Sequence, residues 1–188
     1  MEVERLEYIN TGHTDDLTAR LKGNVFHLTS QSSFDCISAE NRIYHNRDGK
    51  FPIYAGSANG FGKNRGYVPF FNFRNTTDEI ILDTRNRYNF EGPTWFRKYH
   101  PDYSESSLAY LFLSEQGQKE LIPNNQARVE FKKNGHAEQY IPDTEFWYPG
   151  NVSLELIEKV LLVRIFDDAP KKESLFYAHY SLLVNGET

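Results

Sequence analysis

The sequence predicts an α+β fold. Short apolar and aromatic runs typical of strands recur along the 188 residues, and Gly, Pro and Asn turn signals separate them. The helical segments between these runs are short and do not alternate strictly with the strands, which argues against a parallel α/β fold. Hydrophobic residues make up 39% of the chain and charged residues 25%, as in a globular protein. We expect a single domain over residues 1–188 that buries about 70% of its unfolded surface.

Composition narrows the classes of function. The net charge is −5 and the isoelectric point is near 5.7, so no global basic field attracts nucleic acid. A single cysteine, Cys36, excludes an internal disulfide and a multi-cysteine metal site, and we expect it in the core on an apolar helical face. The acidic start and the lack of any long apolar run predict a soluble, cytoplasmic protein with no membrane partner.

The first elements predicted are a lead-in, a strand and a helix. Residues 1–23 form a helical or mixed lead-in, and a short strand follows at 25–29. The hydroxyl groups at 30–33 then cap a helix. His27 and Thr29 lie two residues apart on the strand, so their side chains should point to the same face.

A glycine-rich segment at 56–66 comes next. It has neither the Walker phosphate-loop register nor the dinucleotide-binding glycine motif, so we interpret it as a loop able to close over a ligand. An aromatic strand at 67–74 ends in an arginine, and a further strand is expected at 79–83. The polar, proline-broken stretch at 84–103 is predicted to cross the surface.

The second half of the chain supplies the remaining strands. A buried strand is expected at 108–113, with a short helix over 114–121 after it. A hairpin that starts at 128–131 should turn at Asn134-Gly135. Residues 167–188 are expected to provide the closing strand.

Glu145 opens an aromatic run that Pro149-Gly150 stops, which predicts a short strand. A helical turn capped by Asn151 or Ser153 should follow, and then a buried strand at 160–166. A carboxylate at the mouth of such a unit would be desolvated by aromatic rings and held rigidly. This setting suits a catalytic acid, although a Glu at a strand edge is ordinarily solvated surface.

Motifs for other chemistries are missing. The six histidines form neither H-x-x-x-H nor H-E-x-x-H, so no zinc site is predicted. The nucleophile elbow G-x-S-x-G is lacking too, which argues against a serine hydrolase. No pair of carboxylates is singled out by spacing for glycoside cleavage.

The remaining motifs resemble one family. Phe26-His27-Leu28-Thr29, ahead of a helix, resembles the opening motif of ADP-ribosyltransferase folds, whose first strand carries a histidine. Val68-Pro69-Phe70-Phe71-Asn72-Phe73-Arg74 is similar to a strand of the DarT-type branch, which modifies DNA bases. Glu145, Pro149 and the strand at 160–165 resemble that branch's catalytic glutamate segment. The resemblance covers a core at residues 24–166 and implies a split antiparallel or mixed sheet with short helices packed on it.

The resemblance also implies an activity and a set of roles. NAD would be the substrate, without a metal, and Glu145 would bind the ribose 2′-hydroxyl and steady the oxocarbenium-like sugar as nicotinamide leaves. His27 would hydrogen-bond the adenosine-side ribose, with Thr29 nearby. Stacking aromatics and pyrophosphate-binding arginines complete the expected cofactor site: Tyr54, Tyr67, Phe71, Arg42 and Arg74. The acceptor of ADP-ribose stays open, a nucleobase in DNA being the one that the family suggests.

Two other classes of function stay open. A non-catalytic module could use the same cleft to hold a nucleotide or a protein partner. The high content of aromatic residues, 15% of the chain, and the stretch at 84–107 suit an interface. A binder of single-stranded nucleic acid could use arginines and tyrosines around that stretch: Arg85, Arg87, Tyr88, Arg97 and Tyr99. The oligomeric state is not predicted.

Overall fold

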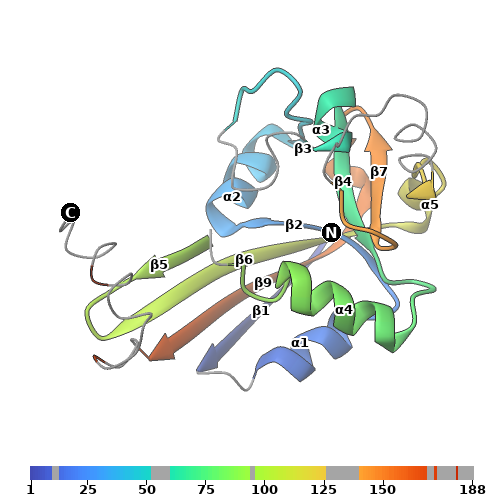
Figure 1. Cartoon of the computed structure of the whole chain (residues 1–188). Helices are drawn as coiled ribbons and strands as arrows, with labels where there is room; N and C mark the ends of the chain where they lie inside the picture. Colours follow the sequence, from blue (N-terminus) through green and yellow to red (C-terminus); the bar gives the residue numbers. More distant parts are fainter. Residues whose placement is uncertain are drawn as a thin grey trace.

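The computed structural model of the chain describes residues 1–9, 13–51, 60–93, 96–125, 140–168, 172 and 181. It confirms an α+β fold with a mixed, mostly antiparallel sheet (Figure 1). The strands of the main sheet are β1 (Glu2–Ile9), β2 (Val25–Ser30), β4 (Tyr67–Asn72), β5 (Arg97–Tyr99), β6 (Tyr103–Leu113), β7 (Glu145–Pro149) and β9 (Ile157–Asp168). Their order is β1-β9-β6-β2-β4-β7, with β5 paired to β6. A second sheet joins β3 (Arg42–Ile43) to β8 (Val152–Ser153).

Short helices cover both faces of the main sheet (Figure 1). They are α1 (His13–Leu21), α2 (Gln31–Glu40), α3 (Phe61–Arg65), α4 (Asp78–Tyr88), α5 (Glu115–Gln118) and the 3-10 turn η3 (Leu154–Leu156). Helices α1 and α4 bury Leu17, Leu21 and Ile81 in one core cluster. Helix α2 buries Phe34 in a second cluster. The sheet therefore separates two cores.

Strand alternation assigns each residue to one of these cores, because successive side chains point to opposite faces. The core under α1 and α4, which we call the α4 face, contains Phe26, Phe73, Tyr110, Leu161 and Val163, among others. The core under α2, which we call the α2 face, contains Val25, Val68, Phe70, Leu111 and Val160, among others.

The sheet opens between β2 and β4. These strands pair at only two positions, Val25 with Asn72 and Phe26 with Phe71, whereas β4 and β7 pair at five. Beyond that short contact, β4 and β7 run in a different direction from β2 and β6 (Figure 1). The strands that carry His27, the aromatic run and Glu145 are β2, β4 and β7, which are neighbours in the sheet.

Several predicted elements are confirmed. The strand at 25–29, its capped helix, the aromatic strand and the strands at 108–113 and 160–166 all form, but the aromatic strand ends at Asn72, so Arg74 lies beyond it. Ser30 caps α2 by accepting a hydrogen bond from the Ser33 amide, and Ser153 caps η3 in the same way through the Glu155 amide. The helix predicted at 114–121 is shorter, ending at Gln118.

The strand predicted at 79–83 is wrong, since these residues lie in α4. Thr77 caps the helix by accepting from the Ile80 amide, and Asp78 and Glu79 occupy its first turn. Ile81 and Thr84 are its buried residues, so the apolar pair at 80–81 belongs to a helical stripe rather than to a strand. The stretch at 84–103 is accordingly not one irregular excursion, because α4 continues to Tyr88 and β5 forms at Arg97.

Two other expectations are confirmed only in part or are wrong. The lead-in at 1–23 is mixed rather than helical throughout, because Glu2–Ile9 form β1, which pairs in parallel with β9, and His13–Leu21 form α1. Cys36 is exposed rather than buried, since Phe34 is the residue of α2 that enters the core. The helix turns by about 100° per residue, which carries Cys36 away from the face that holds Phe34.

Some predictions fall outside the described residues. These are the hairpin at 128–135, the closing strand at 167–188 apart from Asp167, Asp168 and two isolated residues, and the glycine-rich segment before Gly60. Within the described ranges no helix is both long and apolar enough to span a membrane.

Candidate functional site

Glu145 stands at the start of β7 with both carboxylate oxygens hydrogen-bonded. Trp147 donates its indole Nε1–H to Oε1 at 2.7 Å, and the Ile141 backbone N–H donates to Oε2 at 2.6 Å. None of the described Lys, Arg or His residues forms an ion pair with it. Each oxygen has two lone pairs, so one on each oxygen remains available to a ligand.

Burial raises the pKa of Glu145 to about 7, against the lowering effect of the hydrogen bonds from Ile141 and Trp147. The two donors favour the charged form, but desolvation outweighs them because no cation compensates the charge. Glu145 in turn raises the pKa of Tyr88 on α4, where desolvation is the larger cause. The carboxyl group is thus set to change its charge near neutral pH.

A tight turn holds the Glu145 backbone in place. Asp143 adopts a positive φ of 63°, which brings the Ile141 amide back toward the carboxylate. The side-chain amide of Asn124, which is 6% exposed, donates to the backbone oxygens of Ile141 at 3.0 Å and Glu145 at 3.1 Å. The neighbouring Thr144 carbonyl accepts from the Asn72 amide at 2.7 Å, which ties the turn to β4.

Two of the predicted aromatic residues share a sheet face with Glu145. Phe71 is in register with Glu145, and Tyr67 is in register with Pro149 at the other end of β7. Because paired residues and residues two apart point to the same face, Tyr67, Phe71, Glu145 and Trp147 lie on one side. Phe71 also stacks on Phe26, with ring centroids 5.3 Å apart, so it belongs to the α4 face.

His27 and Thr29 lie on the other face. His27 is in register with Leu111 and Thr29 with Ala109, both of which belong to the core of the α2 face. The His27 ring contacts Phe70 in that core, and its Nδ1 lies 2.8 Å from the Pro69 carbonyl. His27 therefore bridges β2 and β4 where their pairing ends.

The hydrogen bond to the Pro69 carbonyl determines which ring nitrogen of His27 carries the proton. Desolvation lowers the pKa of the imidazole, although the Pro69 carbonyl opposes this effect. The ring is then neutral near pH 7, and since a carbonyl can only accept, Nδ1 carries the proton. Nε2 keeps a lone pair that no described residue occupies with a hydrogen bond. His27 can thus accept a hydrogen bond from a ligand hydroxyl.

The structure does not gather the remaining predicted residues around Glu145. Arg42 is exposed in β3, paired with Ser153, and its guanidinium carbon lies 5.8 Å from the Tyr44 ring centroid. Arg74 is exposed and donates to Oε1 of Gln118 at 3.0 Å. Tyr54 lies outside the described residues.

Three residues that hold Glu145 were missed from the sequence: Trp147, Ile141 and Asn124. Trp147 could have been found, because a residue two positions along a strand shares a face with the first. The contribution of Ile141 depends on a backbone amide and on the positive φ of Asp143, for which the sequence carries no clear signal. Asn124 lies far from Glu145 along the chain and no motif marks it.

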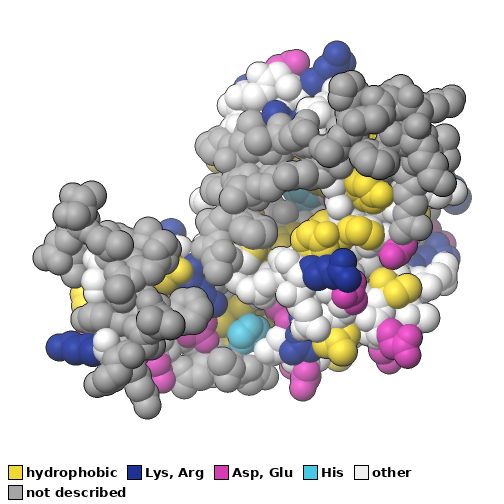
Figure 2. All heavy atoms as spheres, viewed as in Figure 1, with side chains coloured by type: hydrophobic (Ala, Val, Ile, Leu, Met, Phe, Trp, Pro, Cys, Tyr) yellow, Lys and Arg dark blue, Asp and Glu magenta, His cyan; other side chains and the backbone are white. Residues whose placement is uncertain are grey.

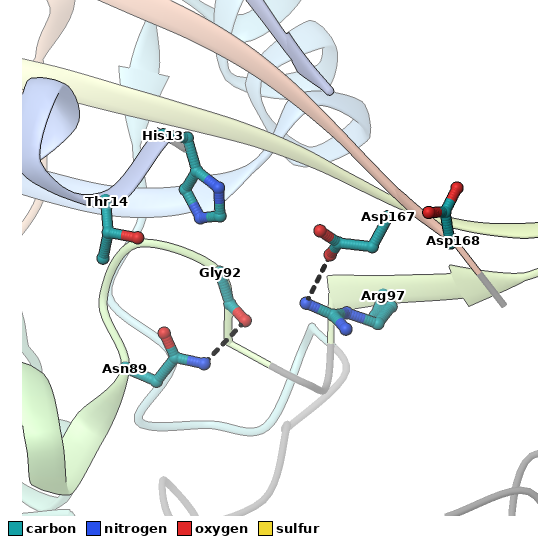
Figure 3. Close-up of a pocket in the computed structure, with 7 residues that line it drawn as sticks. All are labelled: His13, Thr14, Asn89, Gly92, Arg97, Asp167 and Asp168. Atoms are coloured by element: carbon teal, nitrogen blue, oxygen red, sulfur yellow. Dashed lines mark hydrogen bonds and ion pairs between the residues drawn. The ribbon is translucent and has the colours of Figure 1, made fainter. Parts of the chain in front are cut away.

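A separate cavity of about 610 Å³ lies between the start of α1, the loop after α4 and the ends of β5 and β9 (Figure 3). An ion pair joins Nη2 of Arg97 to Oδ2 of Asp167 at 3.1 Å at its edge. Buried atoms of this pair, Nε of Arg97 and Oδ1 of Asp167, have no hydrogen-bond partner in the part of the chain that the structure describes. Arg97, considered above for binding single-stranded nucleic acid, lines this cavity, whereas Glu145 and the described residues predicted to bind NAD do not.

The arginines considered for nucleic-acid binding are engaged with carboxylates. The ion pairs are Arg85 with Glu91 and Asp15, Arg87 with Asp83, and Arg97 with Asp167. On the face shown in Figure 2, Lys and Arg side chains lie among Asp and Glu side chains rather than in a continuous basic patch. Phosphate groups would have to displace these carboxylates, which disfavours a role of the arginines in binding a nucleic-acid backbone.

We compared the chain with protein-family models, curated proteins and solved structures. No family model, no curated protein and no solved structure matches it. Among the described residues no group of three or more His, Cys, Asp or Glu side chains is arranged to hold a metal ion.

Proposed function

We propose that this protein is an ADP-ribosyltransferase-like enzyme that cleaves NAD and transfers ADP-ribose, with Glu145 as the catalytic carboxylate. One observation carries the proposal: a desolvated carboxyl group held by two N–H donors, with no cation beside it among the described residues, whose pKa is raised to about 7. Such a group is costly to maintain, and strongly perturbed carboxyls are concentrated at functional sites.

The proposed reaction breaks the bond between the ribose C1′ and the nicotinamide nitrogen. The bonding electrons leave with neutral nicotinamide, and the ribose acquires oxocarbenium character. An ionised Glu145 beside the ribose stabilises this positive charge more than it stabilises the ground state, which lowers the barrier. A nucleophilic acceptor then bonds to C1′, and Glu145, with its pKa near neutral, accepts the proton that the acceptor loses.

The opening between β2 and β4 supports this reading, because an ADP-ribosyltransferase fold has a split sheet. Phe71, with Glu145 beside it in β7, lies at the closed end of this opening, where β4 still pairs with Phe26 of β2, and His27 follows on the opposite sheet face. NAD would reach both only by lying across the opening, with a ribose hydroxyl donating to Nε2 of His27. The acceptor is proposed only as a nucleophile, a nucleobase in DNA being the candidate that the resemblance offers.

The test is release of nicotinamide from NAD by the purified protein. We expect Glu145→Gln to lower the rate by about 10² to 10⁴-fold, because the amide removes the negative charge but preserves the shape of the side chain. Circular dichroism and thermal unfolding should show an intact fold. Unchanged turnover in Glu145→Gln would remove this residue from the mechanism, and NAD binding without release in the wild type would favour the non-catalytic module.

A further inference from the structure

Trp147 contacts both Glu145 and α3. Its Nε1 donates to Oε1 of Glu145 at 2.7 Å, and its ring packs on Phe61 with centroids 4.4 Å apart. The side chain is 0% exposed, so protein atoms surround it on every side. A single rigid ring thus spans the distance between a helix and the carboxylate.

Helix α3 is seated tightly on this ring. A Cβ placed on Gly62 would lie 2.4 Å from Cδ1 and 2.9 Å from Nε1 of Trp147, closer than atoms can approach. The Arg65 guanidinium carbon lies 3.7 Å from the Phe61 ring centroid, and Nη1 of Arg65 donates to the Phe61 carbonyl at 3.1 Å. Arg65, Phe61, Trp147 and Glu145 therefore form one continuous series of contacts.

The backbone of Trp147 is also fixed. Its N–H donates to the Ile122 carbonyl at 3.2 Å, and its carbonyl accepts from the Ile122 N–H at 2.8 Å. On its other side, β7 pairs with β4 through Pro69. Because Ile122 and β4 hold the backbone of Trp147, a displacement of α3 would act on the indole ring, which contacts Phe61 and Gly62.

We propose that Trp147 is a positioning residue that couples α3, the last part of the glycine-rich segment, to the ionisation and orientation of Glu145. This inference rests on the proposed function, in which Glu145 acts on NAD. The indole N–H favours the charged carboxylate and occupies one lone pair of Oε1, which leaves the other lone pair of that oxygen for the ribose. A displacement of α3 would change this hydrogen bond and so the ionisation of the carboxyl group.

The first test is Trp147→Phe, which keeps an aromatic ring and removes the donor. The acid limb of the pH profile for nicotinamide release should move to higher pH by about one unit, because the charged form of Glu145 loses a hydrogen bond. The carboxyl ¹³C signal of Glu145, followed by NMR, should show the same shift without NAD. Lower stability with an unmoved titration would show that Trp147 only packs, and would overturn the proposal.

The second test leaves Trp147 in place and disturbs its contact with Gly62 of α3. Gly62→Ala should displace the indole and shift the Glu145 titration upward, as in Trp147→Phe. Gly117→Ala is the matched control, since its Cβ would lie 2.5 Å from Cδ1 of Leu113, which is a similar clash in α5. We expect Gly117→Ala to lower stability and to leave the Glu145 titration unchanged; equal shifts in both variants would contradict the coupling.

These readouts separate the two proposals. If the wild type releases no nicotinamide but Trp147→Phe shifts the Glu145 titration, the proposed function is wrong and the positioning role stands. If the wild type releases nicotinamide and the titration of Trp147→Phe equals that of the wild type, the positioning role is wrong and the function stands.

Discussion

Desolvation raises the pKa of both Glu145 and Glu91 to about 7, yet their surroundings differ. Glu91 is 1% exposed, and its Oε2 lies 3.1 Å from Nε of Arg85, while Thr18 donates to its Oε1. Glu145 receives only neutral N–H donors and has no cation among the described residues. A perturbed pKa alone therefore does not distinguish a structural carboxylate from a functional one.

The partners make the distinction. Glu91 joins α1, through Thr18, to α4, through Arg85, so its charge is used inside the fold. Glu145 forms no ion pair with a described residue; its carboxylate accepts from the Trp147 indole and the Ile141 amide, and in the proposed mechanism its remaining lone pairs bind the ribose. We expect substitutions at Glu91 and its partners to change stability, and those at Glu145 and Trp147 to change chemistry.

The largest effect on stability is expected from Arg85→Met. This change leaves Glu91 buried without its cation and should lower the free energy of unfolding by about 2–3 kcal/mol, less than for a fully buried pair because Arg85 is 26% exposed. Urea unfolding provides the measurement. The double variant Arg85→Met/Glu91→Gln should recover part of the loss, because the unpaired charge is gone. Loss of nicotinamide release from the folded fraction of Arg85→Met would contradict a purely structural role for Glu91.

The pH dependence of stability should come next in size. Both carboxyls have folded-state pKa values raised from 4.5 to about 7, so the folded protein holds their protons more tightly than the unfolded chain. Their stabilisation is complete below about pH 4.5 and is lost as pH rises to about 7. Carboxyls with a lowered pKa, such as Glu4 beside Lys159, act at lower pH in the opposite direction.

Urea unfolding between pH 5 and 8 measures this effect. The free energy of unfolding should fall as pH rises, with Glu91 contributing on the order of 1–3 kcal/mol. Glu91→Gln and Glu145→Gln should each flatten the curve, because a Gln does not titrate in this range. A curve as steep in both variants as in the wild type would show that neither carboxyl is perturbed as described.

Thr18→Val should have the smallest effect. It removes a neutral donor from Glu91, as Trp147→Phe removes one from Glu145, and it should lower the free energy of unfolding by about 1 kcal/mol. Thermal unfolding is the measurement, with nicotinamide release as the control. We expect unchanged release per folded molecule, in contrast to Trp147→Phe; a shifted pH profile in Thr18→Val would place Glu91 in the mechanism as well.

The sequence predicted those parts of the fold in which the local pattern and the tertiary context agree. The capped helix after Ser30, the aromatic strand and the strand at 160–166 are examples. It failed for 79–83, where two isoleucines indicate a strand in isolation but the cap at Thr77 and the buried Thr84 define a helix. It also failed for Cys36, because the helical period, rather than the apolar character of the residue, determines which face is buried.

The candidate site shows the same limits. The strand that begins at Glu145 was predicted because its aromatic run and turn are local signals, and Phe71 lies beside Glu145 in the next strand. The two faces of the sheet, which separate His27 from Glu145, follow from a register that the sequence alone did not reveal. The hydrogen bonds from Ile141 and Asn124 depend on a turn at Asp143 that has no sequence motif.

The most direct test measures nicotinamide released from NAD by Glu145→Gln and Glu91→Gln side by side, at pH 7.5 and equal concentrations of folded protein. The two variants make the same chemical change at two desolvated carboxyls. The difference between their rates of nicotinamide release therefore shows which of the two charges the reaction needs. We expect Glu91→Gln to keep the wild-type rate within about threefold and Glu145→Gln to lose at least about 100-fold. Equal rates in the two variants, whether both high or both low, would contradict the assignment of Glu145 as the catalytic carboxylate.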